Sequence, residues 1–319
     1  MKAAVLHQVG GLPRYEDFPD PVAGQGEVVI KVKAVAVENI DKMIAAGTHF
    51  ASKQFIAQLP TIPGFDGVGT LPDGTLVGFS RPRPPYGALA EKTVVTNSNI
   101  VPTPEGIDPA VAVVLASAVT GFCIKSAAGF TPGETVLVQG ATGVAGRLAV
   151  KVARLLGAGR IVGTGRDDHA LQDLLALGAD AVIDTAVPDD ALARAFTQAA
   201  GDGYDVVLDF LWGRPTEILL RTLVPEELKT TKPTRLVQVG ESAGPTLTLA
   251  AESLRTSGVE IYGAAKGLDA ATMMDAYQQV VQWAADGTLT FDLERVPLSQ
   301  IETAWQRTDL RGRRLVVLP

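Results

Sequence analysis

The chain has 319 residues and a formal net charge of −7 at pH 7, with 46% of its residues hydrophobic and 20% charged. This length and composition predict a soluble globular protein with room for two domains. No Lys/Arg cluster forms a basic surface, which argues against nucleic acid and anionic membranes as partners. We find no apolar run long enough to span a bilayer, and the single cysteine, Cys123, predicts a reducing compartment, the cytoplasm.

Residues 1–115 predict a mainly β region. Between residues 27 and 37, apolar residues alternate with Lys31 and Lys33, which is the period of a half-buried strand, and residues 92–95 form another short strand-like run. Residues 39–46 fit a single helix with Asp41 in its early turns. Proline and glycine are frequent between these segments, which indicates loops.

The segment from residue 135 onward is the most informative part of the chain. A short β-branched run, 135–139, meets a turn that contains Gly140, Gly143 and Gly146. From residue 144, apolar residues recur every three to four positions, the period of a helix. Glycine in a strand–turn–helix context lets backbone N–H groups approach a pyrophosphate at the helix N-terminus. This segment therefore predicts a dinucleotide site.

Arg166 indicates which dinucleotide binds. Residues 160–165 form the next strand-like run, and Arg166 follows directly. An acidic residue at this position binds the ribose 2′-hydroxyl of NAD, whereas an arginine suits the 2′-phosphate of NADP. NADPH is therefore the predicted cofactor. Asp167 and Asp168 leave two alternatives open: one of them could take the acidic role, or all three charged residues could mark a helix start.

Strand-like and helical segments alternate through the second half of the chain. Strand-like runs begin near residues 135, 160, 181, 205, 235 and 259, with helical segments such as 171–177 and 191–200 between them. This alternation predicts an α/β fold with a doubly wound parallel sheet. Residues 224–234 predict a surface loop, and the tail predicts a helix at 270–285, a strand at 291–296, a helix at 299–306 and a strand at 314–318.

The sixth strand, residues 258–263, is expected at one end of this sheet. An edge strand exposes unpaired N–H and C=O groups, and a charged residue on it disfavours pairing with another chain. Here Glu260 is the one charged residue of the strand. We therefore predict a homodimer in which this edge pairs with a second copy, and we expect a proline at Glu260 to weaken the dimer. The alternative is that the 224–234 loop or the tail covers the edge.

Five further motifs occur in a fixed order along the chain. They are MKAAV at 1–5, PDP followed by GEVVIKV between 19 and 32, PGFDGVG at 63–69, GALAE at 87–91 and GADAVID at 178–184. In this order they resemble the medium-chain dehydrogenase/reductase superfamily and, within it, the zinc-independent quinone oxidoreductases. The resemblance implies a GroES-like β-rich domain over 1–118, a Rossmann NADPH-binding domain over 119–264, and a tail, 265–319, that returns to the first domain. One departure is the segment after Gly69, which is shorter than in the family.

The resemblance also bears on metal binding. Zinc-dependent relatives have cysteine where Glu38 stands here, and His-Glu where Phe65 and Asp66 stand. The three histidines lie in unrelated segments, whereas zinc needs ligands that converge on a tetrahedron. We therefore predict no metal ligands.

Two residues of the first domain are candidates for catalysis. Hydride transfer to an electron-poor acceptor needs no metal, but a developing oxyanion needs a hydrogen-bond donor or an ordered water. Tyr86 could be that donor, or it could simply pack on the prolines before it. Asp41 lies in the segment that lines the cleft in relatives, or it caps its own helix. Glu38 replaces an asparagine common in quinone reductases, so that amide contact is not carried over.

The resemblance implies cofactor contacts at the carboxyl ends of the strands, where ligands bind in open α/β sheets. Thr120 would contact the nicotinamide edge, Trp212 could wall the nicotinamide or pack between domains, and Arg313 could face the cofactor phosphates or stay solvated. The predicted set is Thr120, Gly140, Ala141, Thr142, Gly143, Val144, Ala145, Gly165, Arg166, Leu211, Trp212, Val239, Gly240, Glu241 and Arg313.

The resemblance implies an NADPH-dependent, zinc-independent reductase of quinones or α,β-unsaturated carbonyls. Two alternatives stay open. An enoyl-thioester reductase would need a basic patch for the phosphate of its thioester carrier, which disfavours it in this acidic chain. A non-catalytic NADPH-binding sensor or structural protein would share the glycine turn but would not turn over any quinone.

Overall fold

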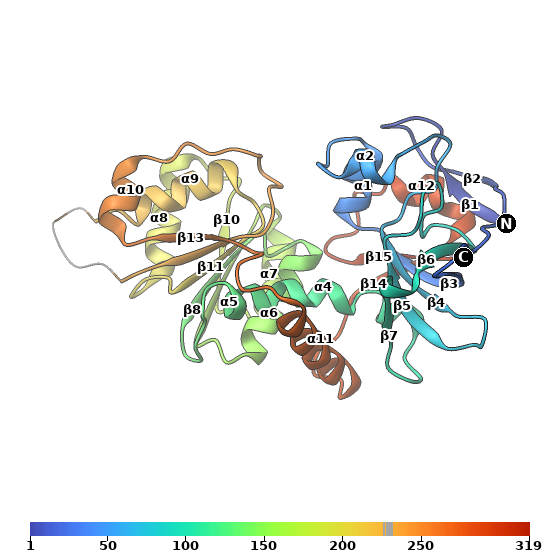
Figure 1. Cartoon of the computed structure of the whole chain (residues 1–319). Helices are drawn as coiled ribbons and strands as arrows, with labels where there is room; N and C mark the ends of the chain where they lie inside the picture. Colours follow the sequence, from blue (N-terminus) through green and yellow to red (C-terminus); the bar gives the residue numbers. More distant parts are fainter. Residues whose placement is uncertain (226, 228–231) are drawn as a thin grey trace. The chain divides into compact units, whose positions relative to one another are not determined.

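The strand-like runs after residue 135 pair in one sheet. The computed structural model describes residues 1–225, 227 and 232–319, and in it these runs form a six-stranded parallel sheet of order β10-β9-β8-β11-β12-β13 (Figure 1). Two adjacent strands, β8 and β11, therefore mark the point where the strand order reverses. The strands are β8 Thr135–Gln139, β9 Arg160–Gly165, β10 Ala181–Asp184, β11 Val206–Asp209, β12 Arg235–Gln238 and β13 Glu260–Gly263. The predicted α/β fold class is confirmed.

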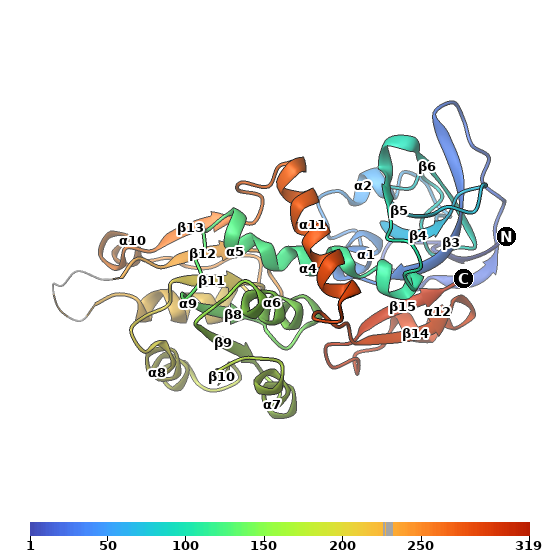
Figure 2. The same ribbon diagram turned by 90° about the horizontal axis from the view of Figure 1, so that it is seen from below.

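Side chains of β8 alternate between the two faces of this sheet. Val136 and Val138 pack in a core cluster with α6 and α7, whereas Leu137 packs in a second cluster with α8 and α9. Burial on both faces explains why these strands read as continuous apolar runs. Figure 2 shows the same sheet from below. The helices from residue 115 to 285 are α4 Leu115–Val119, η2 Thr120–Phe122, α5 Cys123–Ser126, α6 Val144–Leu155, α7 Asp168–Ala176, α8 Asp189–Ala200, α9 Gly213–Thr222, α10 Ala251–Ser257 and α11 Ala270–Ala285.

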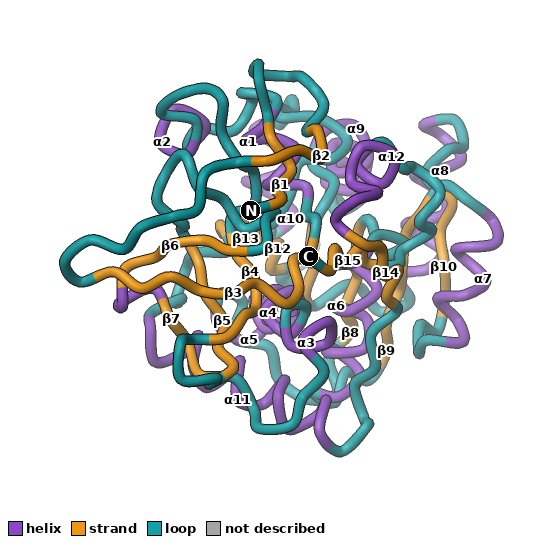
Figure 3. Tube along the Cα trace, turned by 90° about the vertical axis from the view of Figure 1, so that its right-hand side faces the viewer, coloured by secondary structure: helices purple, strands orange, loops and turns teal. Residues whose placement is uncertain are grey.

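The first part of the chain and the last strands form a separate β-rich unit. Its seven-stranded sheet has the order β14-β15-β3-β4-β5-β7, with β6 also paired to β3, and Figure 3 shows β15 beside β14. A two-stranded sheet, β1-β2, completes it. The strands are β1 Lys2–Val5, β2 Arg14–Asp17, β3 Glu27–Ala36, β4 Asp66–Thr70, β5 Leu76–Ser80, β6 Lys92–Thr96, β7 Ile100–Pro102, β14 Leu293–Pro297 and β15 Arg314–Leu318. The helices are α1 Asn39–Ala45, α2 Ser52–Phe55, η1 Asn97–Asn99, α3 Pro109–Ala112, η3 Leu298–Gln300 and α12 Ile301–Trp305.

The division into units differs from the predicted one in the tail. One unit is Met1–Leu115 with Phe291–Pro319, and the other is Ala116–Thr290. The expected tail, 265–319, is thus split, because α11 packs on the second unit. The Trp283 ring stacks on Phe122 with ring centroids 5.5 Å apart, and the Lys151 ammonium donates to the Thr290 carbonyl at 2.8 Å.

Two further predictions concern a membrane-spanning segment and the surface loop at 224–234. One helical stretch among the described residues, Pro109–Ser126, is long and apolar enough by length and composition to cross a membrane. The expectation that no run of this length is present is corrected by this stretch. Most of this stretch (61%) is buried, as in a core helix of a soluble protein. Of the predicted loop at 224–234, residues 226 and 228–231 lie outside the described residues.

Strand β13 is the edge of the parallel sheet, as the sequence predicts. The Glu260 N–H donates to the Thr234 carbonyl at 2.9 Å, and the Ala264 N–H donates to Gln238 at 3.0 Å. Because alternate N–H groups of a strand point to the same side, the N–H of Ile261 faces the open edge. The predicted proline at Glu260 was therefore the wrong probe, since it would break a bond inside the sheet.

Candidate active site

The turn between β8 and α6 requires glycine at two positions. Gly140 has φ +77°, in the left-handed region that favours glycine, and a Cβ at Gly146 would lie 2.2 Å from the Gly140 carbonyl oxygen. Gly143 is exposed, and a Cβ there would meet only that same oxygen, at 3.6 Å. The first N–H groups of α6, those of Val144 and Ala145 among them, have no partner inside the helix. The turn therefore presents hydrogen-bond donors to an anion.

Strand β9 holds this turn in place. The Ala141 N–H donates to the Thr164 carbonyl oxygen at 2.9 Å. A Cβ at Gly165 would lie 2.4 Å from Thr142 Cγ2, so the end of β9 lies directly against the turn. The next residue in the chain is Arg166, which therefore starts beside the turn.

The three charged residues after β9 have different roles. The Asp167 carboxylate accepts the Ala170 N–H at 2.9 Å and caps α7, and Asp168 lies in the first turn of that helix. Both positions correspond to the helix-start alternative. Arg166 is exposed, and the described part of the chain offers it no hydrogen bond or ion pair. Its guanidinium is thus the cation available at the end of β9.

The carboxyl ends of β8, β11 and β12 meet at one edge of the sheet. A Cβ at Gly140 would lie 2.9 Å from Leu211 Cδ2, so Leu211 packs on the turn. The N–H groups of Val239 and Gly240 both donate to the Asp209 carbonyl oxygen, at 2.8 and 3.1 Å. The structure thus brings together residues that the sequence assigned to the cofactor from three separate loops.

Three other predicted cofactor residues lie on the same unit. The Thr120 hydroxyl donates to the Ser117 carbonyl at 2.9 Å, and η2 packs closely on α6. Trp212 is half-buried and has φ +56° and ψ −163°, a backbone conformation that non-glycine residues rarely adopt. Glu241 is exposed.

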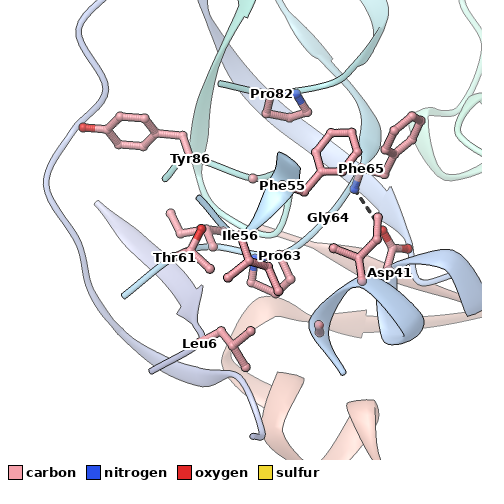
Figure 4. Close-up of a pocket in the computed structure, with 14 residues that line it drawn as sticks. Leu6, Asp41, Phe55, Ile56, Thr61, Pro63, Gly64, Phe65, Pro82 and Tyr86 are labelled. Carbon is pink, nitrogen blue, oxygen red and sulfur yellow. Dashed lines mark hydrogen bonds between the residues drawn. The ribbon is translucent and has the colours of Figure 1, made fainter. Parts of the chain in front are cut away.

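The first unit contains a pocket of about 390 Å³, including the part open to solvent (Figure 4). Its lining is mostly apolar and comes from α1, α2 and the loops that flank Phe65 and Tyr86. The rings of Phe55 and Phe65 meet edge to face with centroids 5.2 Å apart. Asp41 is the acidic residue of this lining.

Asp41 joins two segments of the pocket wall. Its Oδ1 accepts the Phe65 N–H at 2.9 Å, the bond dashed in Figure 4, and its Oδ2 accepts the Glu38 N–H at 2.8 Å. Burial raises the pKa of Asp41 to about 6, because the charged form is desolvated, while the two backbone donors act in the opposite direction. Both carboxylate oxygens are therefore committed to the backbone.

The Tyr86 hydroxyl already has a partner. It donates to the Asp20 carbonyl oxygen at 3.3 Å, and the ring packs edge to face on Phe18 with centroids 5.9 Å apart. Figure 4 shows this hydroxyl pointing away from Asp41. The alternative of a packed loop tyrosine describes this arrangement better than a free donor does.

Two arginines near the C-terminus are paired within the first unit. Arg313, which the sequence offered as a phosphate ligand, hydrogen-bonds through its guanidinium to the Glu294 carboxylate and to the Leu310 carbonyl. The expectation for Arg313 is therefore corrected, because a carboxylate holds its charge. Arg314 Nη2 lies 3.0 Å from Glu38 Oε1.

Comparison with known proteins shows which oxidoreductases the chain resembles. Residues 145–286 match the family model for the zinc-binding dehydrogenase. A probable NADPH-dependent quinone reductase of Emericella nidulans is 26% identical and aligns over 96% of each chain. The quinone oxidoreductase of Thermus thermophilus, whose structure was also solved with NADPH, is 29% identical over 100% of both chains, with a TM-score of 0.78. In sequence and fold the chain is similar to quinone oxidoreductases of the medium-chain dehydrogenase/reductase superfamily.

A third relative of this chain is named for another class of compound. The chloroplastic NADPH-dependent alkenal/one oxidoreductase of Arabidopsis thaliana is 29% identical over 66% of this chain and 57% of that protein. The quinone reductase relatives support an oxidoreductase activity for this chain.

The family model is described as zinc-binding, but the residues of this chain do not fit zinc. Glu38 pairs with Arg314, Phe65 carries no ligand atom, and Asp41 already accepts two backbone N–H groups. Among the described residues, no group of three or more His, Cys, Asp or Glu is placed to hold a metal ion.

Two residues that shape these sites, Asp66 and Arg314, were not predicted as site residues. Asp66 follows Phe65, and its pKa is raised well above the ordinary value because it is desolvated and lies near the carboxyl groups of Glu38 and Asp41. Arg314 stands beside the Arg313 that was singled out. Both residues lie next to motifs of the sequence, which could have drawn attention to them. The residues that they face, Glu38 and Asp41, lie far away in the sequence.

Proposed function

We propose that this oxidoreductase uses NADPH to reduce quinones or α,β-unsaturated carbonyls. The observation that carries the proposal is the glycine turn at 140–146 with the exposed Arg166 beside it. The names of the relatives from Emericella nidulans, Thermus thermophilus and Arabidopsis thaliana support it. When bound, NADPH supplies a hydride from its nicotinamide ring.

The second unit has residues that fit each part of NADPH. The N–H groups of Val144 and Ala145 would hold the pyrophosphate, and the absence of a Cβ at Gly143 would let the backbone approach it. Arg166 would bind the 2′-phosphate with charge-assisted hydrogen bonds. The remaining proposed contacts are Thr120, Gly140, Ala141, Thr142, Gly165, Leu211, Trp212, Val239, Gly240 and Glu241.

The first unit would contribute shape more than acid–base chemistry. A quinone or enone is already electrophilic, so the protein needs chiefly to align it and exclude competing reactions. Asp41 holds the Phe65 segment against α1 by accepting the Phe65 N–H, and it caps its own helix by accepting the N–H of the N-cap residue Glu38, so we assign it a positioning role. Tyr86 could donate to the acceptor oxygen only after releasing the Asp20 carbonyl.

The test measures NADPH oxidation, as loss of NADPH absorbance, with a panel of benzoquinones, naphthoquinones and enones. We expect turnover that survives exhaustive chelation and no stoichiometric zinc by elemental analysis. Tight NADPH binding without turnover of any acceptor would favour the sensor or structural alternative. One bound zinc per chain, with activity lost on its removal, would contradict the metal-independent site.

Arg166→Ala should discriminate between the two nicotinamide cofactors. Loss of charge-assisted hydrogen bonds should weaken NADPH binding by about 1.5–3 kcal/mol, whereas NADH binding should hardly change. Arg194→Ala is the matched control, because Arg194 is another exposed arginine of the same unit. Calorimetric titration of both cofactors measures the effect. Equal losses for NADPH and NADH would show that Arg166 does not read the phosphate.

We further propose that the enzyme is a homodimer paired along β13. Ile261 presents its N–H to the open edge, and a second copy could extend the sheet there. Sedimentation should show a dimer for the unmodified chain at micromolar concentration, and Ile261→Pro should shift it toward the monomer because proline removes that donor. An unmodified monomer would contradict edge pairing.

A further inference from the structure

Three energetically costly features lie together at the ends of β8 and β11. Asp209 is buried, and desolvation raises the pKa of its carboxyl group above the ordinary value. Gln139 is also buried, and its amide oxygen has no hydrogen-bond partner in the described part of the chain. Trp212 adopts its strained backbone conformation only three residues beyond Asp209. Such local costs persist where the surrounding structure enforces them, and they gather at functional sites.

A chain of hydrogen bonds connects these features. The Gln139 amide donates to the Thr216 hydroxyl at 3.1 Å, and that hydroxyl donates to Asp209 Oδ2 at 2.6 Å. The other carboxylate oxygen, Oδ1, accepts the N–H groups of Leu211 and Trp212 at 2.9 and 3.0 Å. An ionised Asp209 carboxylate can only accept, and in that state Thr216 donates to Asp209 and Gln139 donates to Thr216.

The carboxylate therefore holds the turn that leads into α9. Trp212 is the N-cap residue of α9, and Gly213 follows with φ +57°. A Cβ at Gly213 would lie 2.9 Å from the Ala243 carbonyl oxygen, so the turn has little freedom to relax. Without the Asp209 acceptor, the strain at Trp212 would favour a different path for this turn.

We propose that the buried chain Gln139–Thr216–Asp209 is a positioning device that sets Leu211 and Trp212 for the nicotinamide half of NADPH. This inference rests on the proposed function. It adds that three buried polar residues, none of which needs to touch NADPH, determine its affinity through the conformation of one turn. Gln139 directly precedes the Gly140 turn, so the same chain ties the pyrophosphate side of the site to the nicotinamide side.

The first test compares Thr216→Val with Thr216→Ser in the full-length chain. Valine has nearly the shape of threonine but has no hydroxyl group. Serine keeps the hydroxyl group that accepts from Gln139 and donates to Asp209. We expect the NADPH dissociation constant, measured by calorimetry, to rise about tenfold for Thr216→Val and to stay within twofold for Thr216→Ser. A purely structural role would lower the melting temperature of Thr216→Val and leave the dissociation constant unchanged, and that result would overturn the proposal.

The second test asks whether the effect passes through the strained residue. Glycine adopts the Trp212 conformation without strain. In Trp212→Gly the conformation of the turn should therefore no longer depend on the hydrogen bonds among Gln139, Thr216 and Asp209. In that background Thr216→Val should change the NADPH dissociation constant less than twofold. Independent effects of the two substitutions, adding without coupling, would contradict the mechanism.

Gln139→Met provides a variant that should fold even if Thr216→Val does not. It keeps the length of the side chain and removes the unpartnered buried oxygen, so we expect an equal or higher melting temperature with a three- to tenfold rise in the NADPH dissociation constant. Unchanged affinity in this variant would also overturn the proposal. If the unmodified chain itself bound no NADPH, the proposed function would fail instead, so the two failures are distinguishable.

Discussion

Gly146→Ala is expected to abolish measurable NADPH binding and to lower the free energy of unfolding by about 3 kcal/mol. The new Cβ would lie 2.2 Å from the Gly140 carbonyl oxygen and 2.7 Å from Ala141 Cα. Both are backbone atoms, so the clash cannot be relieved by a side-chain rotation, and α6 must move away from the turn. Urea unfolding and calorimetric titration with NADPH measure the two effects.

Gly143→Ala is the matched control for this substitution. Its Cβ would meet only the Gly140 carbonyl oxygen at 3.6 Å, an ordinary contact, so the free energy of unfolding should stay within about 0.5 kcal/mol of the unmodified value. NADPH binding should still weaken at least tenfold, because the added methyl group would stand where the pyrophosphate approaches the backbone. Unchanged NADPH affinity in Gly143→Ala would show that the cofactor does not lie over this turn.

Asp41→Ala is expected to destabilise the first unit by about 2–6 kcal/mol. The substitution leaves the N–H groups of Glu38 and Phe65 without their acceptor, and each buried unsatisfied donor costs about 1–3 kcal/mol. Asp41→Asn should cost less, because its amide oxygen can still accept one of the two. Urea unfolding of the unmodified chain, Asp41→Asn and Asp41→Ala measures the three free energies of unfolding, which should fall in that order. Equal stability of Asp41→Ala and the unmodified chain would remove Asp41 from the pocket framework.

The pH dependence of Asp41 has a definite sign. Its pKa in the folded chain is about 6, above the ordinary value of 3.8, so the folded state binds the proton more tightly than the unfolded state does. The contribution of Asp41 to stability is thus fully present below about pH 4 and is lost as pH rises through 6. The advantage of the unmodified chain over Asp41→Asn should therefore shrink from pH 4 to pH 7, by at most about 3 kcal/mol. An advantage that grows over this range would contradict the raised pKa.

Local sequence patterns predicted the parallel sheet and much of the tail. Strands β8 and β9 and helix α6 begin where the apolar periodicity changes, and α11 Ala270–Ala285 and β15 Arg314–Leu318 match the predicted residues. These elements are predictable because each buries one regular set of positions. Their apolar residues therefore repeat with the period of a helix or a strand.

Other elements depend on close approach between distant segments. Strand β4 contains Gly67 and Gly69, and it reads as a loop by local pattern. In the structure a Cβ at Gly69 would lie 2.5 Å from Ile30 Cγ2, so glycine is present because β3 packs there. The short helices within 109–126 were also not predicted from the sequence.

The same distinction separates the parts of the site. The sequence alone determined the glycine turn and the cation after β9, because a strand, a glycine turn and a helix start lie within a few consecutive residues and their pattern is local. Only the tertiary structure decided that Glu38 pairs with Arg314, that Tyr86 donates to Asp20, and that Gln139 reaches Asp209 through Thr216. Those partners meet because strands and helices far apart in the chain pack together, and no periodicity within a single segment specifies which polar groups then face each other.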